Sequence, residues 1–513
     1  MLTNDVNNQQ VVNGKKDLSK KRLWIGLGLS ALSGVLLAAT MPGYLNLGLI
    51  GWVALVPMLL AIELLPDVRP RLLALPFALI WSIAVHNWYA SIFNPLLGYL
   101  MLIGAGAWYS IIISLGINLQ RRLPGSLKLI ALPVVWSALE FGKFIAPIVS
   151  EWWFVLLAKS QWGFPPALQV LSLTGFPGLS FLLMLSNLAL AFFILKVWQK
   201  RKIYWPGLCA LVFVTVVLAW GTVIIPTQPT DTFSIASTVD QANQPEIQSL
   251  SNMPTEKEGY YADTPEMSQA IFDVNAALTR QVAKQKVAFV VWPENEFADA
   301  KDGKFTRQLG ALARETGAYI ITDMVWRSPT GMHDTAVMVA PDGNEAGRRA
   351  KTHLFPGEKK FGFVPGPPGF PVFNTPHGKV GLGVCYDYHF LDVVKGLARN
   401  GADIMLMPTD DDMHQNRLFP YYHATDAVFR AVEHRVTFAT AGTNGVSIIV
   451  DPYGRIIAKS GVNERTVITG TTFTVPDRTL YTRIGDWFGW LMILATAVLV
   501  GIAFFQRNRR KSH

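Results

Sequence analysis

Cysteine and charged residues are both scarce in this chain. Cys209 and Cys385 are the only cysteines among 513 residues, which excludes a fold held together by a disulfide framework. Charged residues make up 16% of the chain and hydrophobic residues 50%. Between Leu23 and Ile225 only 15 of 203 residues are Asp, Glu, Lys or Arg, whereas 226–486 has ordinary polarity. That composition excludes an ordinary water-soluble globule and predicts a membrane part followed by a water-soluble part.

Apolar runs long enough to cross a bilayer recur along the charge-poor part and once more near the end of the chain. A membrane-spanning helix needs about 20 consecutive apolar residues. Eight runs recur, and most of them meet this length, at 23–40, 44–65, 71–90, 94–119, 127–147, 168–195, 203–225 and 487–505. The fifth run is the weakest because it contains Glu140 and Lys143. These two residues lie on one helical face and could pair, or they could lie near the interface and only snorkel.

The net charge of +9 comes from short basic clusters beside the apolar runs. With eight spans, every cluster falls on the same side of the membrane, and this pattern orients membrane proteins with the basic side in the cytoplasm. We therefore expect no nucleic-acid partner and both termini in the cytoplasm. The expected parts are a basic tail (1–22), a seven-helix transmembrane domain (23–225), an extracytoplasmic domain (226–486), an eighth helix (487–505) and a second basic tail (506–513).

The first apolar run has an alternative interpretation as a cleaved signal peptide. It ends in the small residues Ala38-Ala39-Thr40, which resemble a cleavage site. The run is longer than a usual signal core, so we favour a retained helix, and cleavage would leave the other spans oriented as before.

The extracytoplasmic part alternates short β-rich runs with helical stretches. Strands are predicted at 233–239, 287–292, 318–323, 336–340, 345–351, 380–385, 403–407, 437–441, 447–450 and 467–475. Helices are predicted at 264–284, 303–315, 390–399 and 418–434. Alternating strands and helices with added hairpins are typical of a layered α/β domain.

Three of these predicted strands end in a residue able to take part in acyl transfer: Glu294, Lys351 and Cys385. Active sites of layered α/β domains gather at strand ends. A thiolate attacks a carbonyl, a carboxylate takes the thiol proton, and an ammonium stabilises the oxyanion. Taken separately, each residue has a plainer reading, as a core cysteine, a helix-capping glutamate or a solvated lysine. Cys209 lies within a span with no base near it in sequence.

Together these segments resemble the nitrilase superfamily and its Glu-Lys-Cys triad. The resemblance rests on Trp-Pro-Glu at 292–294, Lys-Thr-His-Leu-Phe at 351–355 with Gly-Glu at 357–358, and Val-Cys-Tyr-Asp at 384–387. Gln-Ala-Asn at 241–243 and the segment from 430 to 455 are similar to the opening and closing segments of that family. One branch, the apolipoprotein N-acyltransferases, has its nitrilase domain outside the membrane between the seventh and eighth of eight spans, as expected here.

The resemblance implies a multi-span α-helical membrane domain joined to an αββα nitrilase-like domain, and it assigns roles to residues. It implies Glu294 as general base, Lys351 as oxyanion stabiliser, Cys385 as nucleophile and Glu358 as the second, orienting glutamate. Residues expected to contact substrate are Tyr386, Asp387, Phe355, Phe361 and Phe363, the three phenylalanines as candidates for an apolar lid.

The implied reaction has two steps and needs no cofactor or metal. Cys385 takes an acyl chain from a phospholipid as a thioester and passes it to the N-terminal amine of a diacylglyceryl-cysteine lipoprotein. The resemblance also implies the inner membrane of a bacterium, with the bilayer itself as a partner.

The chain departs from the family pattern around the expected pocket. Asp387 stands where that branch usually has Glu, and the loop after Glu358 differs from the usual compact form. Thr-Asp-Asp-Asp-Met-His at 409–414 replaces the usual Asn-Asp and aromatic. This acidic loop could be an oxygen-rich metal site or, as we favour, a solvated loop.

Two other functions stay open at this stage. The first is a membrane-tethered amidase or nitrilase, in which water accepts the acyl group. A polar, open pocket would favour it, and an apolar lid would favour transfer. The second is a non-catalytic binding module on a membrane anchor, against which the complete set of Glu294, Lys351 and Cys385 argues.

Overall fold

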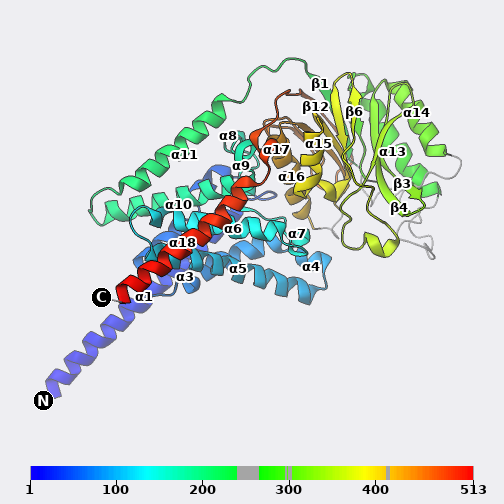
Figure 1. The fold of residues 1–513 in the computed structure, drawn as a ribbon. Helices are drawn as coiled ribbons and strands as arrows, with labels where there is room; N and C mark the ends of the chain where they lie inside the picture. The colour runs from blue at the N-terminus through cyan, green and yellow to red at the C-terminus, as the bar shows by residue number, and fades with distance from the viewer. Residues whose placement is uncertain (1, 240–264, 295–296, 298–302, 412–415, 512–513) are drawn as a thin grey trace.

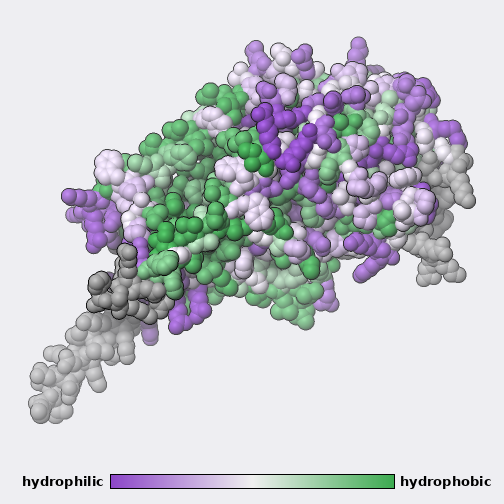
Figure 2. Space-filling view, viewed as in Figure 1, coloured by the Kyte–Doolittle hydropathy of each residue, from purple (hydrophilic) through white to green (hydrophobic). Residues whose placement is uncertain are grey.

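The computed structural model describes residues 2–239, 265–294, 297, 303–411 and 416–511. It consists of a helical half and a two-sheet half that lie against each other (Figure 1). The helical half has seven long helices: α1 (Leu2–Thr40), α3 (Pro70–His86), α5 (Pro95–Arg122), α6 (Leu127–Ile145), α10 (Phe176–Trp198), α11 (Trp205–Val223) and α18 (Trp487–Lys511). In Figure 2 hydrophobic residues dominate the visible surface of these helices, and hydrophilic residues are concentrated on the two-sheet half.

Helix lengths support most of the predicted spans. Among the described residues five helices are long and apolar enough to cross a membrane, or up to six if the bent pair Leu127–Ile145 and Val149–Gln161 counts as one span. The third predicted span is shorter than expected, because α3 has 17 residues. The eight-span topology and the domain boundaries stay predictions.

The predicted span over 44–65 is not one regular α-helix. The chain there forms a 3-10 turn, η1 (Gly48–Trp52), and a short helix, α2 (Val56–Leu64), which has Pro57 in its first turn. Two buried side chains satisfy the backbone groups that this break leaves free. Asn187 Oδ1 accepts from the Leu55 N–H at 2.7 Å, and Gln161 Nε2 donates to the Gly48 carbonyl at 2.8 Å. Irregular backbone at such a depth needs internal partners of this kind.

Glu140 and Lys143 are both buried, but they do not form an ion pair with each other among the described contacts. Glu140 Oε1 accepts from the Leu157 N–H at 2.7 Å and thereby holds the segment that follows the bend after α6. Lys143 Nζ lies 3.5 Å from the ring centroid of Trp153. Neither residue snorkels, and both fasten the loop that faces the two-sheet half.

The two-sheet half confirms the predicted layered α/β fold. One sheet has the order β12-β1-β2-β3-β4-β5 and the other β11-β10-β9-β8-β7-β6. The first contains β1 (Phe233–Val239), β2 (Phe289–Val291), β3 (Tyr319–Ser328), β4 (Gly331–Val339), β5 (Glu345–Ala350) and β12 (Thr466–Thr472). The second contains β6 (Val372–Thr375), β7 (Gly378–Leu382), β8 (Ile404–Asp410), β9 (Thr437–Thr443), β10 (Ile448–Val450) and β11 (Ile456–Lys459). Sequence patterns missed β6 and β11, which are four residues each.

The central strands of each sheet are parallel and buried on both faces. β1, β2 and β3 run parallel, as do β7, β8 and β9. The sheets pack together through their inner faces, while α13 (Pro265–Ala283) and α14 (Lys304–Thr316) contact the first sheet. α15 (Leu391–Arg399) and α16 (Phe419–His434) contact the second, which completes the αββα order (Figure 1). Every residue of β9 is buried, as expected for a strand covered on both sides.

The two halves share one hydrophobic core. A single cluster of buried apolar residues contains Phe154 and Leu168 of the helical half together with Tyr388 and Val428 of the two-sheet half. On the sheet side this cluster involves mainly α15 and α16, which therefore contact the helical half with one face and their sheet with the other. The halves are consequently a single packed unit.

A buried ion pair crosses this shared core. Lys159 Nζ lies 2.7 Å from Asp426 Oδ1, both side chains are fully buried, and Lys159 also donates to the Tyr422 carbonyl at 2.9 Å. Asp426 Oδ2 is 2.9 Å from Nδ1 of His389, whose Nε2 lies 3.0 Å from the Ser150 carbonyl. Burial would raise the pKa of Asp426, but Lys159 and His389 lower it to about 2. The network thus ties the loop after α6 to α16 and to the turn that carries Cys385.

We expect Lys159→Met to destabilise the protein by about 3–5 kcal/mol, because it leaves the Asp426 carboxylate buried without its counter-charge. Thermal unfolding of the full chain in detergent measures this loss. The matched variant Lys159→Met/Asp426→Asn removes both charges and keeps an acceptor for His389, so it should recover much of the stability. A double variant as unstable as the single one would contradict this account.

Candidate active site

Four strand ends and the turns after them meet between the two sheets. Glu294 follows β2, Lys351 follows β5, Cys385 begins the 3-10 turn η4 (Cys385–Tyr388) after β7, and Asp410 ends β8. The structure thus brings together the three residues that the sequence suggested for acyl transfer. Glu294, Lys351 and Cys385 are all buried, with exposed fractions of 7%, 1% and 8%.

Lys351 lies at the centre of a cluster of carboxylates. Its Nζ is 2.8 Å from Glu294 Oε1, 2.7 Å from Glu358 Oε1 and 3.1 Å from Asp334 Oδ2. Lys351 donates hydrogen bonds to Glu294 and Glu358, and its contact with Asp334 is an ion pair. Glu358 therefore lies where the sequence suggested. Asp334 was missed, because it lies between His333 and Thr335 inside β4 and no motif distinguishes it in the sequence.

Burial and charge shift the pKa values of the whole cluster. Burial would lower the pKa of Lys351, but the carboxylates around it raise that pKa well above its ordinary value. Burial raises the pKa of Glu294 and of Glu358, and Lys351 partly offsets both shifts. Burial also raises the pKa of Asp334 well above its usual range, and Lys351 partly offsets that shift. The lysine stays charged, and Glu294 is a stronger base than an exposed glutamate.

Cys385 has an unusual backbone conformation. Its φ is +44°, a left-handed value that is uncommon for non-glycine residues and that strained active-site residues often adopt. Thr409 Oγ1 donates to Cys385 Sγ at 3.3 Å, and Sγ lies 3.5 Å from the Asp410 carbonyl. Burial and the Glu294 charge raise the pKa of the thiol well above its usual value. The thiol is therefore neutral at rest, and a base must remove its proton before it can attack.

Glu294 is oriented as such a base. Its Oε2 accepts from the Asp410 N–H at 2.8 Å while Oε1 faces Lys351. Because the Asp410 carbonyl lies beside Cys385 Sγ, one short segment at the end of β8 contacts both base and nucleophile.

Asp387 lies inside the protein with its oxygens occupied. Its Oδ1 accepts from the N–H groups of Thr352 and His353, both at 2.9 Å, and its Oδ2 lies 2.8 Å from Arg349 Nη1. These bonds tie the Cys385 turn to the end of β5. The substrate contact suggested by the sequence for Asp387 stays a prediction.

Aromatic residues from both halves form one side of the site. The Tyr386 hydroxyl donates to the Glu151 carbonyl, and its ring lies edge-on to Phe355 with centroids 5.3 Å apart. Phe355 in turn packs edge-on to Trp152, at 5.7 Å. Trp152 belongs to α7 (Val149–Trp152), in the loop after α6. The helical half therefore supplies part of the wall beside the residue that follows the nucleophile.

The structure describes the side chain of only one of the other two phenylalanines suggested for an apolar lid, Phe361 and Phe363. Phe363 is 4% exposed and forms an isolated bridge with Met332 at the start of β4. Phe361 ends the 3-10 turn η3 (Glu358–Phe361), and its side chain lies outside the described residues.

A hydrogen-bonded histidine and aspartate lie beside the thiol, and the sequence did not suggest this pair. His423 Nδ1 and Asp411 Oδ1 are hydrogen-bonded at 2.6 Å, and both residues are buried. A ring nitrogen of His423, an oxygen of Asp411 and Cys385 Sγ all lie within 4.8 Å of one another. Asp411 is thus no part of a solvated loop, which corrects the expectation for that residue. Asp412 and His414 lie outside the described residues.

Comparisons with known proteins agree with this architecture. Residues 241–472 match the carbon-nitrogen hydrolase family, and residues 33–189 match the apolipoprotein N-acyltransferase N-terminal domain. An apolipoprotein N-acyltransferase from Geobacter metallireducens is 26% identical over 94% of this chain and 95% of its own length. The chain belongs to the apolipoprotein N-acyltransferase family. A second relative of that name, from Thermotoga maritima, is 24% identical over 96% of this chain and 97% of its own.

Two similar proteins with amidase names cover a smaller share of the chain. The omega-amidase NIT2 of Xenopus tropicalis is 32% identical over 34% of this chain and 68% of its own length. A crystal structure of an amidase from Nesterenkonia sp. covers 50% of this chain and 94% of its own at 21% identity, with a TM-score of 0.39. As a member of the apolipoprotein N-acyltransferase family, the chain is an N-acyltransferase of the carbon-nitrogen hydrolase superfamily.

We expect alkylation of Cys385 by iodoacetamide to slow as the pH falls, because a protonated Glu294 cannot take the thiol proton. Burial and the Glu358 charge raise the pKa of Glu294, so the rate should decline at a higher pH than an ordinary glutamate would give. Glu358→Gln removes one of these causes and should move the decline to lower pH. Measurements in a Cys209→Ser background isolate Cys385, and an unchanged profile in Glu358→Gln would count against the assignment of Glu294 as base.

Proposed function

We propose that this N-acyltransferase moves an acyl chain from a phospholipid to the N-terminal amine of a diacylglyceryl-cysteine lipoprotein, through a thioester on Cys385. The observation that carries the proposal is the shared site. A thiol, a base and an ammonium meet beside a wall to which the helical half contributes. An enzyme whose donor and acceptor are both held in a bilayer needs its nucleophile against its membrane part.

In the first step Glu294 takes the proton of Cys385, and Sγ attacks the ester carbonyl of the phospholipid. The charge that develops on the carbonyl oxygen is stabilised by Lys351, with a backbone N–H of the Cys385 turn as a second donor. When the tetrahedral intermediate collapses, the C–O ester bond breaks and Glu294 returns its proton to the leaving alkoxide. The products are a lysophospholipid and an acyl thioester.

In the second step the amine of the acceptor attacks the thioester carbonyl. Glu294 accepts the proton that the amine must lose, the C–S bond breaks, and the proton passes to the Cys385 thiolate. Lys351 stabilises the oxyanion in both steps, and Glu358 and Asp334 hold its ammonium in place. The Asp411–His423 pair orients the β8 end that contacts both Cys385 and Glu294.

The proposed setting is a bacterial inner membrane, with both termini in the cytoplasm and the two-sheet half outside. The basic clusters between spans support this orientation. Lipid anchors on donor and acceptor explain why a carbon-nitrogen hydrolase fold is joined to spanning helices.

The decisive experiment is the intact mass of the purified full chain after incubation with phospholipid and no acceptor. We expect one added acyl group that hydroxylamine removes, with no adduct in Cys385→Ala and none in Glu294→Gln. Both variants should still fold, and Cys385→Ala should unfold at nearly the wild-type temperature because it removes no charge from the buried cluster around Lys351. Hydrolysis of small amides by a protein that never acquires an acyl group would instead favour the tethered amidase.

We expect Trp152→Ala to shorten the lifetime of this thioester, because the aromatic wall beside Phe355 keeps water from the site. The rate at which the acyl mass disappears without acceptor measures the effect. Trp198→Ala, which removes a 70%-exposed tryptophan at the end of α10, serves as the matched control and should leave the lifetime unchanged. Equal lifetimes in Trp152→Ala and the wild type would show that the wall does not exclude water.

A further inference from the structure

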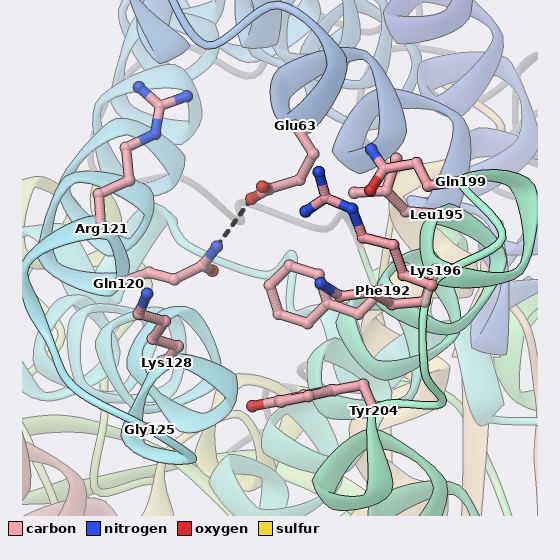
Figure 3. A pocket seen from close by; sticks show the side chains of 11 residues that line it. Glu63, Gln120, Arg121, Gly125, Lys128, Phe192, Leu195, Lys196, Gln199 and Tyr204 are labelled. Atoms are coloured by element: carbon pink, nitrogen blue, oxygen red, sulfur yellow. Dashed lines mark hydrogen bonds between the residues drawn. The ribbon is translucent and has the colours of Figure 1, made fainter.

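A polar pocket opens at the end of the helical half that lies away from the two-sheet half. Its volume is about 440 Å³, and it is lined by residues of α2, α5, α6, α10 and the loop before α11. Figure 3 shows the side chains that surround it. The catalytic residues and the aromatic wall lie at the opposite end of the helices, so this pocket is separate from the proposed active site.

Positive charge predominates in the pocket. Lys128, Lys196 and Arg201 line it, and Glu63 is the one carboxylate among its lining residues. Within the described part of the chain, no carboxylate lies within 4.0 Å of these three cations. A fourth cation, Arg121, donates to the carbonyls of Ile62 and Pro66 at 3.3 Å each and so ties α5 to the end of α2. The lining residues therefore favour an anion.

The pocket also has an organised set of neutral polar groups. Gln120 is 3% exposed, and its Nε2 donates to Glu63 Oε1 at 2.8 Å. Its Oε1 and the Tyr204 hydroxyl are buried atoms without a hydrogen-bond partner in the described residues. The Tyr204 hydroxyl points into the cavity in Figure 3. Buried polar atoms without partners are costly, so a ligand that supplies both donors and acceptors would stabilise this arrangement.

Basic residues at this end are expected from membrane orientation alone, but orientation does not require a pocket. Here cations from three segments surround one cavity that has buried acceptors at its base. Phe192 and Leu195 give it an apolar side as well. Negatively charged phosphate oxygens match the cations, hydroxyl donors match Glu63 and Gln120, and a hydrocarbon part matches the apolar side.

We propose that this pocket binds the phosphate headgroup of an anionic glycerophospholipid from the leaflet opposite the two-sheet half. Basic pockets between spanning helices are suited to such headgroups. The shared chemistry is a phosphate ester that carries hydroxyl groups, which a bilayer lipid or a soluble phosphate ester can supply. The membrane is the favoured source because the pocket lies between spanning helices and has an apolar side.

The test is native mass spectrometry of the full chain in detergent with phosphatidylglycerol, with phosphatidylcholine, and with glycerol 3-phosphate as soluble competitor. We expect retention of phosphatidylglycerol over phosphatidylcholine, which carries the same phosphate without net charge. The variant Lys128→Gln/Lys196→Gln/Arg201→Gln should weaken that retention more than about tenfold, since it removes the three cations that would attract the headgroup phosphate.

A charge-matched control separates a site from general attraction. Arg122→Gln/Lys200→Gln/Lys202→Gln removes three neighbouring cations that do not line the pocket and should retain the lipid. Tyr204→Phe, which removes one hydroxyl and no charge, should weaken retention by a smaller factor. Alkylation of Cys385 at the wild-type rate shows that each variant is folded.

Equal losses in the pocket variant and the control variant would overturn the proposal, because they would indicate nonspecific electrostatics. Full displacement by glycerol 3-phosphate, with no preference between the two lipids, would also overturn it and would identify a soluble phosphate ester as the ligand. None of these outcomes depends on acyl transfer, so the proposed function is tested separately.

Discussion

One buried ammonium determines the arrangement of the active site. Lys351 is 1% exposed and has three carboxylates within 3.1 Å, so neither the cation nor the acids would be stable there alone. The requirement for mutual neutralisation brings together the ends of β2 and β5, a residue of β4 and the loop after β5. Glu294 is thereby fixed in place. The same constraint keeps Lys351 charged, which is the state that can stabilise an oxyanion.

Local patterns were sufficient to predict most of the two-sheet half. Strands there end at turns that the sequence marks clearly. An acid, a lysine or a cysteine directly after a buried strand can therefore be recognised in the sequence as a candidate catalytic residue. Asp334 was not visible, because it lies within β4, where its neighbours decide whether it faces solvent or a lysine 17 positions further along. His423 was hidden for a similar reason, since its partner Asp411 belongs to a different element.

The helical half was harder to predict, because an apolar run indicates that a segment is buried and does not indicate whether its helix is continuous. Residues 44–65 are almost entirely apolar, with Asn46 and Glu63 as exceptions, yet the helix is interrupted there. Asn187 and Gln161 from distant segments bond to the backbone groups at the interruption. Polar residues inside a span are thus a signal for irregular backbone elsewhere in the bundle. The bend after α6 shows the same relation, with Glu140 holding the Leu157 N–H.

The core shared by the two halves fixes the position of the Cys385 thiol relative to the helical half. Lys159 and Asp426 pin the loop after α6 to α16, and the Tyr386 hydroxyl meets the Glu151 carbonyl of that loop. The thiol is therefore held at a fixed distance from the helical half. A reacting group must reach the thiol at that distance, because the thiol does not move outward to meet it. For the acceptor proposed above, selectivity would then depend on the length of the chain between the amine and its lipid anchor, with little recognition of the polypeptide that follows.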